Sequence, residues 1–487
     1  MVAKCPVSNN SGTSCPFASS NAHAATSYPN AAKLNDDGII TNLNSKRSSE
    51  GMGLPEAMSK ETIDMIIATA PVVAPKALDI TKCFYGKVLG KHPELKQFFN
   101  TSVSRCSRSV PILVVIEIHM TILPNTSSPV FFFHPKSQHN VPISDHQPKA
   151  LAASIIAYAT NINDLAPLLV EGGPIESICH RHVALAIHPM QYVVVHENLM
   201  AAIGEVLGEV VTPAIAAAWS EAVLFLAKAM IDTEEPLYQM VERREGGWSG
   251  FAEFEVSKIV ALTEVVKQVS FRPPADSPLS GKKFAFTEGQ YLTIQIDIDG
   301  DGLTAPRHYT ATSPTGADYL QCTIKKQTGG KVSTYVHEQL KVGDKVTLAT
   351  PMGVFILPEE PSSSVLMSAG IGVTPMVNMK RKLGDSLKLV VHVDRYPESH
   401  PYREFFEEDS NSKTLFKYTR VTGRPTVEDL VGETLEMAGT DNEFFICGPE
   451  KWMMDVQEAL MAKGAKKVVC EVFGSQLATG CPFFQTS

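Results

Sequence analysis

The chain has 487 residues, a length that usually corresponds to about three domains. Hydrophobic residues make up 44% and charged residues 20% of it, which is typical of a soluble globular protein. The formal net charge of −9 argues against nucleic acid as the main partner, because DNA-binding domains usually carry a basic surface.

Nothing in the sequence predicts a membrane or secreted protein. The longest apolar run, residues 112–122, is shorter than the roughly 20 residues of a spanning helix, and it contains Glu117 and His119. The first residues lack the basic start and apolar core of a secretory signal. Nine cysteines, an odd number spread along the chain, indicate reduced thiols. We therefore expect a cytoplasmic protein with no stable membrane insertion. A monomer is also expected, although no sequence feature indicates the oligomeric state.

The first part of the chain is expected to be a disordered extension followed by a helical domain. Residues 1–58 are rich in Ser, Asn, Ala and Gly and have little apolar periodicity. After Ser59, a suitable helix N-cap, apolar residues recur at helical spacing in 63–99 and 151–238. These patterns predict an all-α domain over residues 59–245.

One segment does not fit the helical domain. Residues 101–137 have no helical period and contain several prolines, and a long structureless insert is unusual in a compact domain. We treat residues 102–136 as an atypical insert, because joining Thr101 to Ser137 leaves the short connection FFNTSQHNVPIS. Two origins stay open: a translated intron or gene-model error, and a genuine lineage-specific loop.

After residue 250 the period changes from helical to alternating. Residues 254–260 and 291–296 alternate apolar and polar side chains, as half-buried strands do. Further strands are expected at 320–325 and 345–348, separated by Gly-containing turns. Residues 250–360 are therefore predicted to form an antiparallel β-barrel.

In the last part of the chain, short apolar runs alternate with helical stretches. The runs cover residues 365–367, 387–393 and 443–447. This alternation is typical of a parallel sheet wrapped by helices. Residues 362–487 are therefore predicted to form an α/β Rossmann-like domain.

Residues 368–375 (SAGIGVTP) have the composition of a phosphate-binding loop. They follow a predicted strand and open a predicted helix. Glycines let the backbone approach a pyrophosphate, and a helix N-terminus offers unpaired N–H groups. A tight structural turn is the alternative interpretation.

Four histidines of the α domain lie close together in the sequence: His180, His182, His188 and His196. A haem iron needs one neutral imidazole whose other ring nitrogen bonds an acceptor. Spacing alone does not select one of them, and each is more often an ordinary core or surface residue.

Several motifs together resemble one family. They are YGKVLGKHPELKQFFN (85–100), HVALAIHPMQY (182–192), RHYT (307–310), the SAGIGVTP loop, CGP (447–449) and EVFG (471–474). In this order they resemble flavohaemoglobins, in which a haem-binding globin is fused to a ferredoxin-reductase-like FAD and NAD(P) module. The resemblance covers about residues 61–474, apart from the insert.

The resemblance implies a haem site in the α domain. It makes His182 the iron ligand, and Tyr192 and Glu234 the residues that orient it. Tyr85, Gln147, Leu151 and Phe99 would line the haem pocket. A purely structural role is the alternative for Gln147, since Ser144-x-x-Gln147 is also a helix capping box.

The resemblance also implies FAD and nicotinamide sites. Arg307 would meet the flavin pyrophosphate, Tyr309 would pack on the isoalloxazine, and the Thr310 hydroxyl would lie near its reactive nitrogen. Thr310 replaces the serine of bacterial members, which keeps the hydroxyl. The residues implied to contact FAD or NAD(P)H are Tyr291, Arg307, His308, Tyr309, Thr310, Gly330, Val332, Ser333, Gly370, Gly372, Thr374, Pro375, Cys447, Gly448, Pro449 and Phe473.

The activity implied is that of a nitric oxide dioxygenase, which oxidises NO with O2 to nitrate using electrons from NAD(P)H, FAD and haem b. Two other functions stay open: a haem-based gas sensor, and a diaphorase-type NAD(P)H reductase. The motifs do not decide between NADH and NADPH. Cys-Pro pairs at residues 5–6, 15–16 and 481–482 are more often chance matches than regulatory haem contacts.

Overall fold

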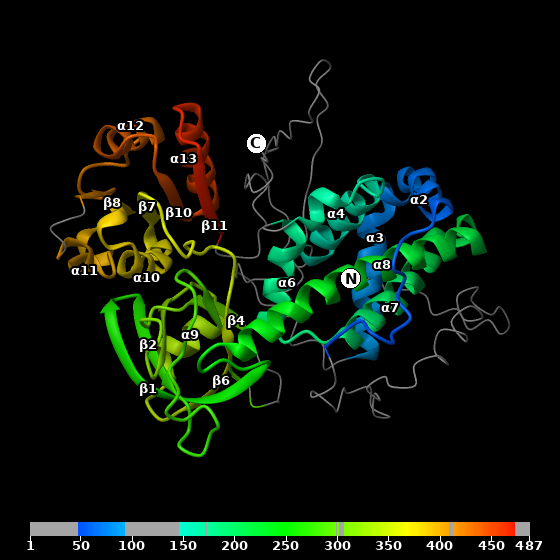
Figure 1. The fold of residues 1–487 in the computed structure, drawn as a ribbon, viewed down its shortest axis with the longest axis horizontal. Coiled ribbons are helices and arrows are strands. Elements are labelled where there is room, and N and C mark those ends of the chain that lie inside the picture. Colours follow the sequence, from blue (N-terminus) through cyan, green and yellow to red (C-terminus); the bar gives the residue numbers. More distant parts are fainter. Residues whose placement is uncertain are drawn as a thin grey trace, which may run out of the picture.

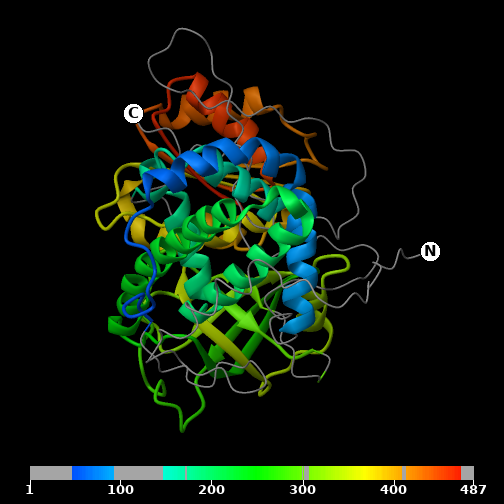
Figure 2. The ribbon, with the colours of Figure 1, turned by 90° about the vertical axis from the view of Figure 1, so that its right-hand side faces the viewer.

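The computed structural model describes residues 47–92, 146–170, 173–298, 300, 306–408 and 413–472. They form a helical domain, an antiparallel barrel and a parallel-sheet domain, in chain order (Figure 1). Seen from the helical domain, the parallel-sheet domain lies above and the barrel below (Figure 2). The expected fold class, with all-α, β-barrel and Rossmann-like parts, is confirmed. The insert at 102–136 and the Cys-Pro pairs lie outside the described residues.

The helical domain is built around long amphipathic helices. Its helices are α2 (Lys60–Val73), α3 (Ala77–Lys91), α4 (His146–Thr160), α5 (Ala166–Leu169), α6 (Pro174–Ala184), α7 (Pro189–Leu207) and α8 (Pro213–Arg243). Ser59 caps α2 as expected, since its side chain accepts a hydrogen bond from the Thr62 N–H. Phe84, Ile80 and Trp219 lie fully buried in the main core between these helices.

The predicted disorder of residues 1–58 is wrong for residues 47–58. Met52 and Leu54 are buried against Ile231 of α8, and the Arg47 guanidinium lies over the Tyr238 ring. The segment has no helix or strand period because individual side chains hold it on the helical domain. Sequence periodicity therefore could not detect it.

The barrel contains β1 (Phe251–Thr263), β2 (Val266–Arg272), β3 (Tyr291–Gln295), β4 (Arg307–Thr310), β5 (Leu320–Lys325) and β6 (Lys345–Met352). Among the described residues they form a six-stranded sheet in the order β4-β3-β6-β1-β2-β5 with antiparallel pairs. A bridge between Ala311 and Cys322 joins the two edges of this sheet. One helix, α9 (Lys331–Glu338), follows β5.

The third domain has a parallel sheet covered on both faces. Its strands β7 (Ser364–Ala369), β8 (Leu387–Asp394), β9 (Lys413–Tyr418), β10 (Glu443–Gly448) and β11 (Lys467–Val472) lie in the order β11-β10-β7-β8-β9. Its helices are α10 (Thr374–Leu383), α11 (Arg403–Glu407), α12 (Val427–Ala438) and α13 (Glu450–Ala462). Apolar residues of α12 and α13 pack on one face, and those of α10 and α11 on the other.

Helix α8 connects the helical domain to the barrel (Figure 1). Just after it, Arg244 donates to the Gln290 side chain at 3.1 Å and to the Pro351 carbonyl at 3.2 Å. Met352, at the end of β6, is packed in an apolar cluster with Val183 of α6 and Tyr238 of α8. The two domains are therefore in direct contact at α6, where the sequence places His182.

Candidate functional site

His182 lies near the end of α6 and is held by side chains from two other helices. Its Nδ1 atom is 2.7 Å from Glu234 Oε1 of α8 and 2.7 Å from the Tyr192 hydroxyl of α7. The Tyr192 hydroxyl itself donates to Glu234. Burial, reinforced by the Glu234 carboxylate, raises the pKa of Tyr192 well above its usual value, so the phenol remains a donor. The Nδ1–H group of His182 faces the carboxylate, which leaves Nε2 available for a ligand.

The three other histidines of this stretch have structural roles. His180 Nδ1 accepts from the Gly353 N–H at 3.3 Å, and His196 Nε2 lies 2.8 Å from the Ser220 hydroxyl. His188 caps α7 by accepting from the Met190 N–H. Burial and the Arg47 guanidinium lower the pKa of His188 to about 4, so its ring is neutral and can accept. The geometry therefore distinguishes His182, which is the histidine with an imidazole–carboxylate–phenol network.

Two of the expected pocket residues lie in the main core of the helical domain. Tyr85 of α3 and Leu151 of α4 are buried and belong to the same apolar cluster. Burial raises the pKa of Tyr85, so its hydroxyl stays protonated. Gln147 lies in the first turn of α4, but its side chain is outside the described part of the molecule, as is Phe99.

In the barrel, the expected flavin residues lie on β3 and β4. Arg307 and Thr310 are the two ends of β4, which pairs with β3 so that Tyr309 lies opposite Leu292 and Thr310 opposite Tyr291. His308 Nδ1 is 2.8 Å from the Thr293 hydroxyl, and the His308 ring lies 4.6 Å from the Tyr291 ring. Among the described residues, the buried Tyr291 hydroxyl has no hydrogen-bond partner.

The second expected phosphate loop opens α9. Gly330 is the N-cap of this helix, and Val332 and Ser333 are buried in its first turn. The Ser333 hydroxyl accepts from the Gln327 N–H at 3.0 Å, which fixes the loop before the helix. The N-terminal N–H groups of α9 give this turn a positive potential suited to an anion.

In the third domain, the SAGIGVTP segment begins in the last two residues of β7 and leads into the start of α10, so it joins a strand to a helix as predicted. Gly370 has a φ of 54°, in the left-handed region that favours glycine. Gly372 lies so close to β10 that a Cβ atom there would be 2.2 Å from the Cys447 carbonyl oxygen. The two predicted nicotinamide motifs, residues 370–375 and 447–449, are therefore in contact.

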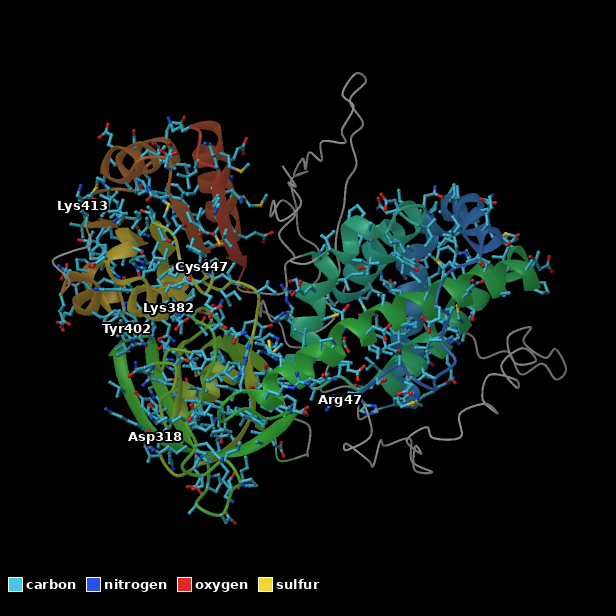
Figure 3. The ribbon with its side chains drawn as sticks, in the orientation of Figure 1. Arg47, Asp318, Lys382, Tyr402, Lys413 and Cys447 are labelled. Carbon is cyan, nitrogen blue, oxygen red and sulfur yellow. The ribbon has the colours of Figure 1, made fainter. Side chains whose placement is uncertain are left out.

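These motifs lie at the edge of the parallel sheet that faces the barrel, where Figure 3 labels Cys447. Thr374 donates its hydroxyl hydrogen to the Thr310 hydroxyl across the two domains, at 3.2 Å. Cys447 is buried, and burial raises the pKa of its thiol well above the usual value. Pro449 caps the start of α13. Phe473 lies outside the described residues.

Sequence reasoning missed one set of residues at the junction of the three domains. Arg181 of α6 interacts electrostatically with Tyr291 of β3 and with Glu471 of β11. Burial raises the pKa of Glu471 to about 7, and Arg181 opposes that rise. The only signals in the sequence were that Arg181 precedes His182 and that Glu471 begins the EVFG motif.

Comparisons with known proteins agree with this organisation. Residues 126–230 match the globin family, and residues 254–356 match the oxidoreductase FAD-binding domain family. Flavohemoproteins of Bacillus anthracis and Rhizobium meliloti are each 29% identical to this chain over 86% of its length, and the matches cover 98% and 99% of those proteins. A flavohemoglobin crystal structure from Malassezia yamatoensis, with bound FAD and heme, has 26% identity and a TM-score of 0.67 and covers 86% of this chain and all of its own.

The chain is assigned a globin domain and an FAD-binding reductase domain, and over most of its length it is similar to flavohemoproteins. Both matched domains and the order of the three parts agree with that assignment. Among the described helices, α8 is long and apolar enough to cross a membrane by length and composition alone. It packs against α2, α6 and α7 of the globin domain, as the core helix of a globular domain does.

Proposed function

We propose that this protein is a flavohaemoglobin that acts as a nitric oxide dioxygenase, which oxidises NO with O2 to nitrate using electrons from NAD(P)H. The observation that carries the proposal is the network in which Glu234 accepts from both His182 and Tyr192. A carboxylate on Nδ1 makes an imidazole a stronger electron donor to a metal at Nε2. An electron-rich axial ligand favours oxygen chemistry over reversible oxygen carriage.

The residues present fit a haem and an FAD. His182 offers one buried imidazole with its tautomer fixed, which is what a haem iron requires. The buried, unpartnered Tyr291 hydroxyl between the barrel and α6 fits a polar cofactor that supplies its missing hydrogen bond. When bound, the haem supplies the oxygen chemistry, and the FAD converts a two-electron hydride donor into a source of single electrons.

In the haem site, His182 would hold the iron, and Tyr192 and Glu234 would keep its imidazole in the donor tautomer. Tyr85, with its hydroxyl protonated, would offer a hydrogen bond on the opposite side of the pocket, and Leu151 would exclude water. Gln147 and Phe99 are proposed as further lining residues from the family resemblance.

In the reductase, Arg307 and the first turn of α9 would bind the FAD phosphates. Tyr309 would pack on the flavin, and Thr310 would hold a hydroxyl beside it. The Gly370–Pro375 turn would bind the phosphates of NAD(P)H, with Cys447 to Pro449 on the nicotinamide side. Thr374 contacts Thr310, which supports a short path from the nucleotide site to the flavin site.

A spectrum and a rate measurement test the proposal. The purified protein should have a Soret band, and NAD(P)H should reduce its haem. NAD(P)H oxidation in air should rise strongly when NO is added, with nitrate as the product. A gas sensor would bind NO without this increase, and a diaphorase would lack the Soret band. Either of these two results would contradict the dioxygenase assignment.

A further inference from the structure

The turn that follows His182 has an unusual residue at its centre. Helix α6 ends with hydrogen bonds from Ile187 N to the His182 carbonyl and from Ala186 N to the Val183 carbonyl, both at 3.0 Å. These two bonds define a Schellman motif, whose left-handed position is usually glycine. Ala186 occupies it, with a φ of 58°. A Cβ atom makes this conformation unfavourable, so the rest of the structure must hold the turn in place.

Two side chains hold this turn through one carbonyl group. The Ile187 carbonyl accepts from the Tyr238 hydroxyl at 2.6 Å and from the Arg47 guanidinium at 2.9 Å. The same guanidinium lies over the Tyr238 ring, 4.0 Å from its centroid. Arg47 therefore fixes both the carbonyl and the other residue that donates to it. A planar guanidinium is suited to donating and stacking at once.

The rest of the N-terminal segment covers the residues that orient His182. Met52 and Leu54 are buried in a cluster that includes Tyr192. Ser49 donates to Asp232 of α8 at 2.5 Å, and Glu56 pairs with Lys228 of the same helix at 3.2 Å. Figure 3 labels Arg47 beside α8. The segment thus follows α8 along the stretch that carries Glu234, and keeps water from Tyr192.

We propose that residues 47–58 form a strap over the His182 side of the haem site, and that Arg47 is a positioning residue for the His182 imidazole. The proposal rests on His182 being the iron ligand. Arg47 does not touch the imidazole. It acts through the Ile187 carbonyl, the Ala186 turn and the His182 carbonyl, to which that turn is bonded.

The test uses the full-length holoprotein and three variants. Arg47→Ala should broaden the iron–imidazole stretching band of the ferrous, ligand-free protein in resonance Raman spectra and shift it to lower frequency. Haem transfer to apomyoglobin should become about tenfold faster, because a charged hydrogen-bond donor is lost. Arg47→Lys should give intermediate values, since a lysine can donate but cannot stack as a plane. Glu56→Ala is the matched control, because it removes only an exposed carboxylate of the same strap, and its ion pair with Lys228, and should leave both readouts unchanged.

A second substitution in the Arg47→Ala protein distinguishes positioning of the His182 imidazole from a general effect on stability. Replacing Ala186 by glycine removes the Cβ penalty of the left-handed turn, so Ala186→Gly should restore most of the iron–imidazole band in the Arg47→Ala background. An Arg47→Ala protein with a wild-type iron–imidazole band would overturn the proposed positioning role of Arg47, even if its melting temperature falls. Failure of the underlying assumptions looks different. If His182 is not the iron ligand, His182→Ala keeps its haem; if the protein is not a dioxygenase, NAD(P)H oxidation by the wild type does not rise when NO is added.

Discussion

The Thr374 hydroxyl lies 3.2 Å from the Thr310 hydroxyl, and both side chains are buried. Thr374 belongs to the glycine-rich turn of the parallel-sheet domain, and Thr310 ends strand β4 of the barrel. Two motifs that are 64 positions apart in the sequence therefore meet where hydride transfer is proposed.

This contact predicts a defined effect on flavin reduction. Thr310→Val keeps the shape of the side chain but removes its hydroxyl. Thr374 then loses its hydrogen bond across the two domains and keeps only the Ile371 carbonyl as acceptor, and the flavin loses a nearby donor. Flavin reduction by NAD(P)H, followed by stopped-flow absorbance, should slow by about tenfold, the equivalent of one lost hydrogen bond of about 1.4 kcal/mol. Thr310→Ser should reduce its flavin at nearly the wild-type rate. Equal rates for Thr310→Val and the wild type would exclude this role.

A second prediction concerns Gly372. Gly372→Ala places a Cβ atom 2.2 Å from the Cys447 carbonyl, so the turn or strand β10 must move. We expect a loss of about 1–3 kcal/mol in stability, as for other overpacked sites, and a higher KM for the nicotinamide nucleotide. Gly432→Ala in α12 is the control, because nothing lies within 4 Å of its Cβ position and alanine favours a helix. A Gly372→Ala protein with wild-type stability and KM would refute the close contact.

The Glu234 carboxylate should lower the midpoint potential of the haem. Glu234→Gln keeps an acceptor for His182 but removes the buried negative charge. A neutral acceptor forms a weaker hydrogen bond and stabilises the oxidised haem less than a carboxylate does. A loss of about 1.4 kcal/mol in that stabilisation raises the one-electron midpoint potential by about 60 mV. The haem midpoint potential should therefore rise by tens of millivolts, measured by spectroelectrochemistry, while haem content stays near that of the wild type. An unchanged potential would show that Glu234 only supports the fold.

The parallel-sheet domain should be sensitive to acid. His392 and His400 stack with their ring centroids 3.8 Å apart, and burial lowers the pKa of both, that of His400 to about 2. Since these folded-state values lie below 6.5, the unfolded chain binds more protons as the pH falls below 6.5, and stability is lost in that direction. The slope is up to about 1.4 kcal/mol per pH unit for each histidine.

His400→Phe should flatten this dependence, because phenylalanine keeps an aromatic ring on His392 and cannot take a proton. Urea unfolding of the wild type and of His400→Phe between pH 7 and 5 measures this pH dependence. The difference between their free energies of unfolding should shrink or reverse as the pH falls. Parallel curves would mean that His400 does not titrate on unfolding in this range.

Much of the fold could be predicted from the sequence. The strands predicted at residues 320–325 and 387–393 correspond to β5 and β8, whose apolar residues are buried in the structure. Strand β2 was not recognised, since the adjacent polar residues Lys267 and Gln268 break the alternation of apolar and polar side chains. The 47–58 strap was missed because Arg47 and Met52 act as single contacts with no period.

The candidate site, too, could be predicted only in part from the sequence. His182, Tyr192 and Glu234 were found through the family motif, and their hydrogen bonds then followed from the structure. Spacing alone would not have separated His182 from His180. The electrostatic interaction of Arg181 with Glu471 joins residues 290 positions apart. No local pattern can indicate such a pair, because it depends on how three domains dock.

The most direct test of the account is the yield of nitrate per NAD(P)H in the wild type and in His182→Ala. Converting NO and O2 to nitrate takes one electron, and a hydride supplies two, so the wild type should form two nitrates for each NAD(P)H oxidised. His182→Ala should lose its haem and make no nitrate, while its flavin is still reduced by NAD(P)H. Nitrate formation at the wild-type yield by a His182→Ala protein that retains haem would contradict the central claim.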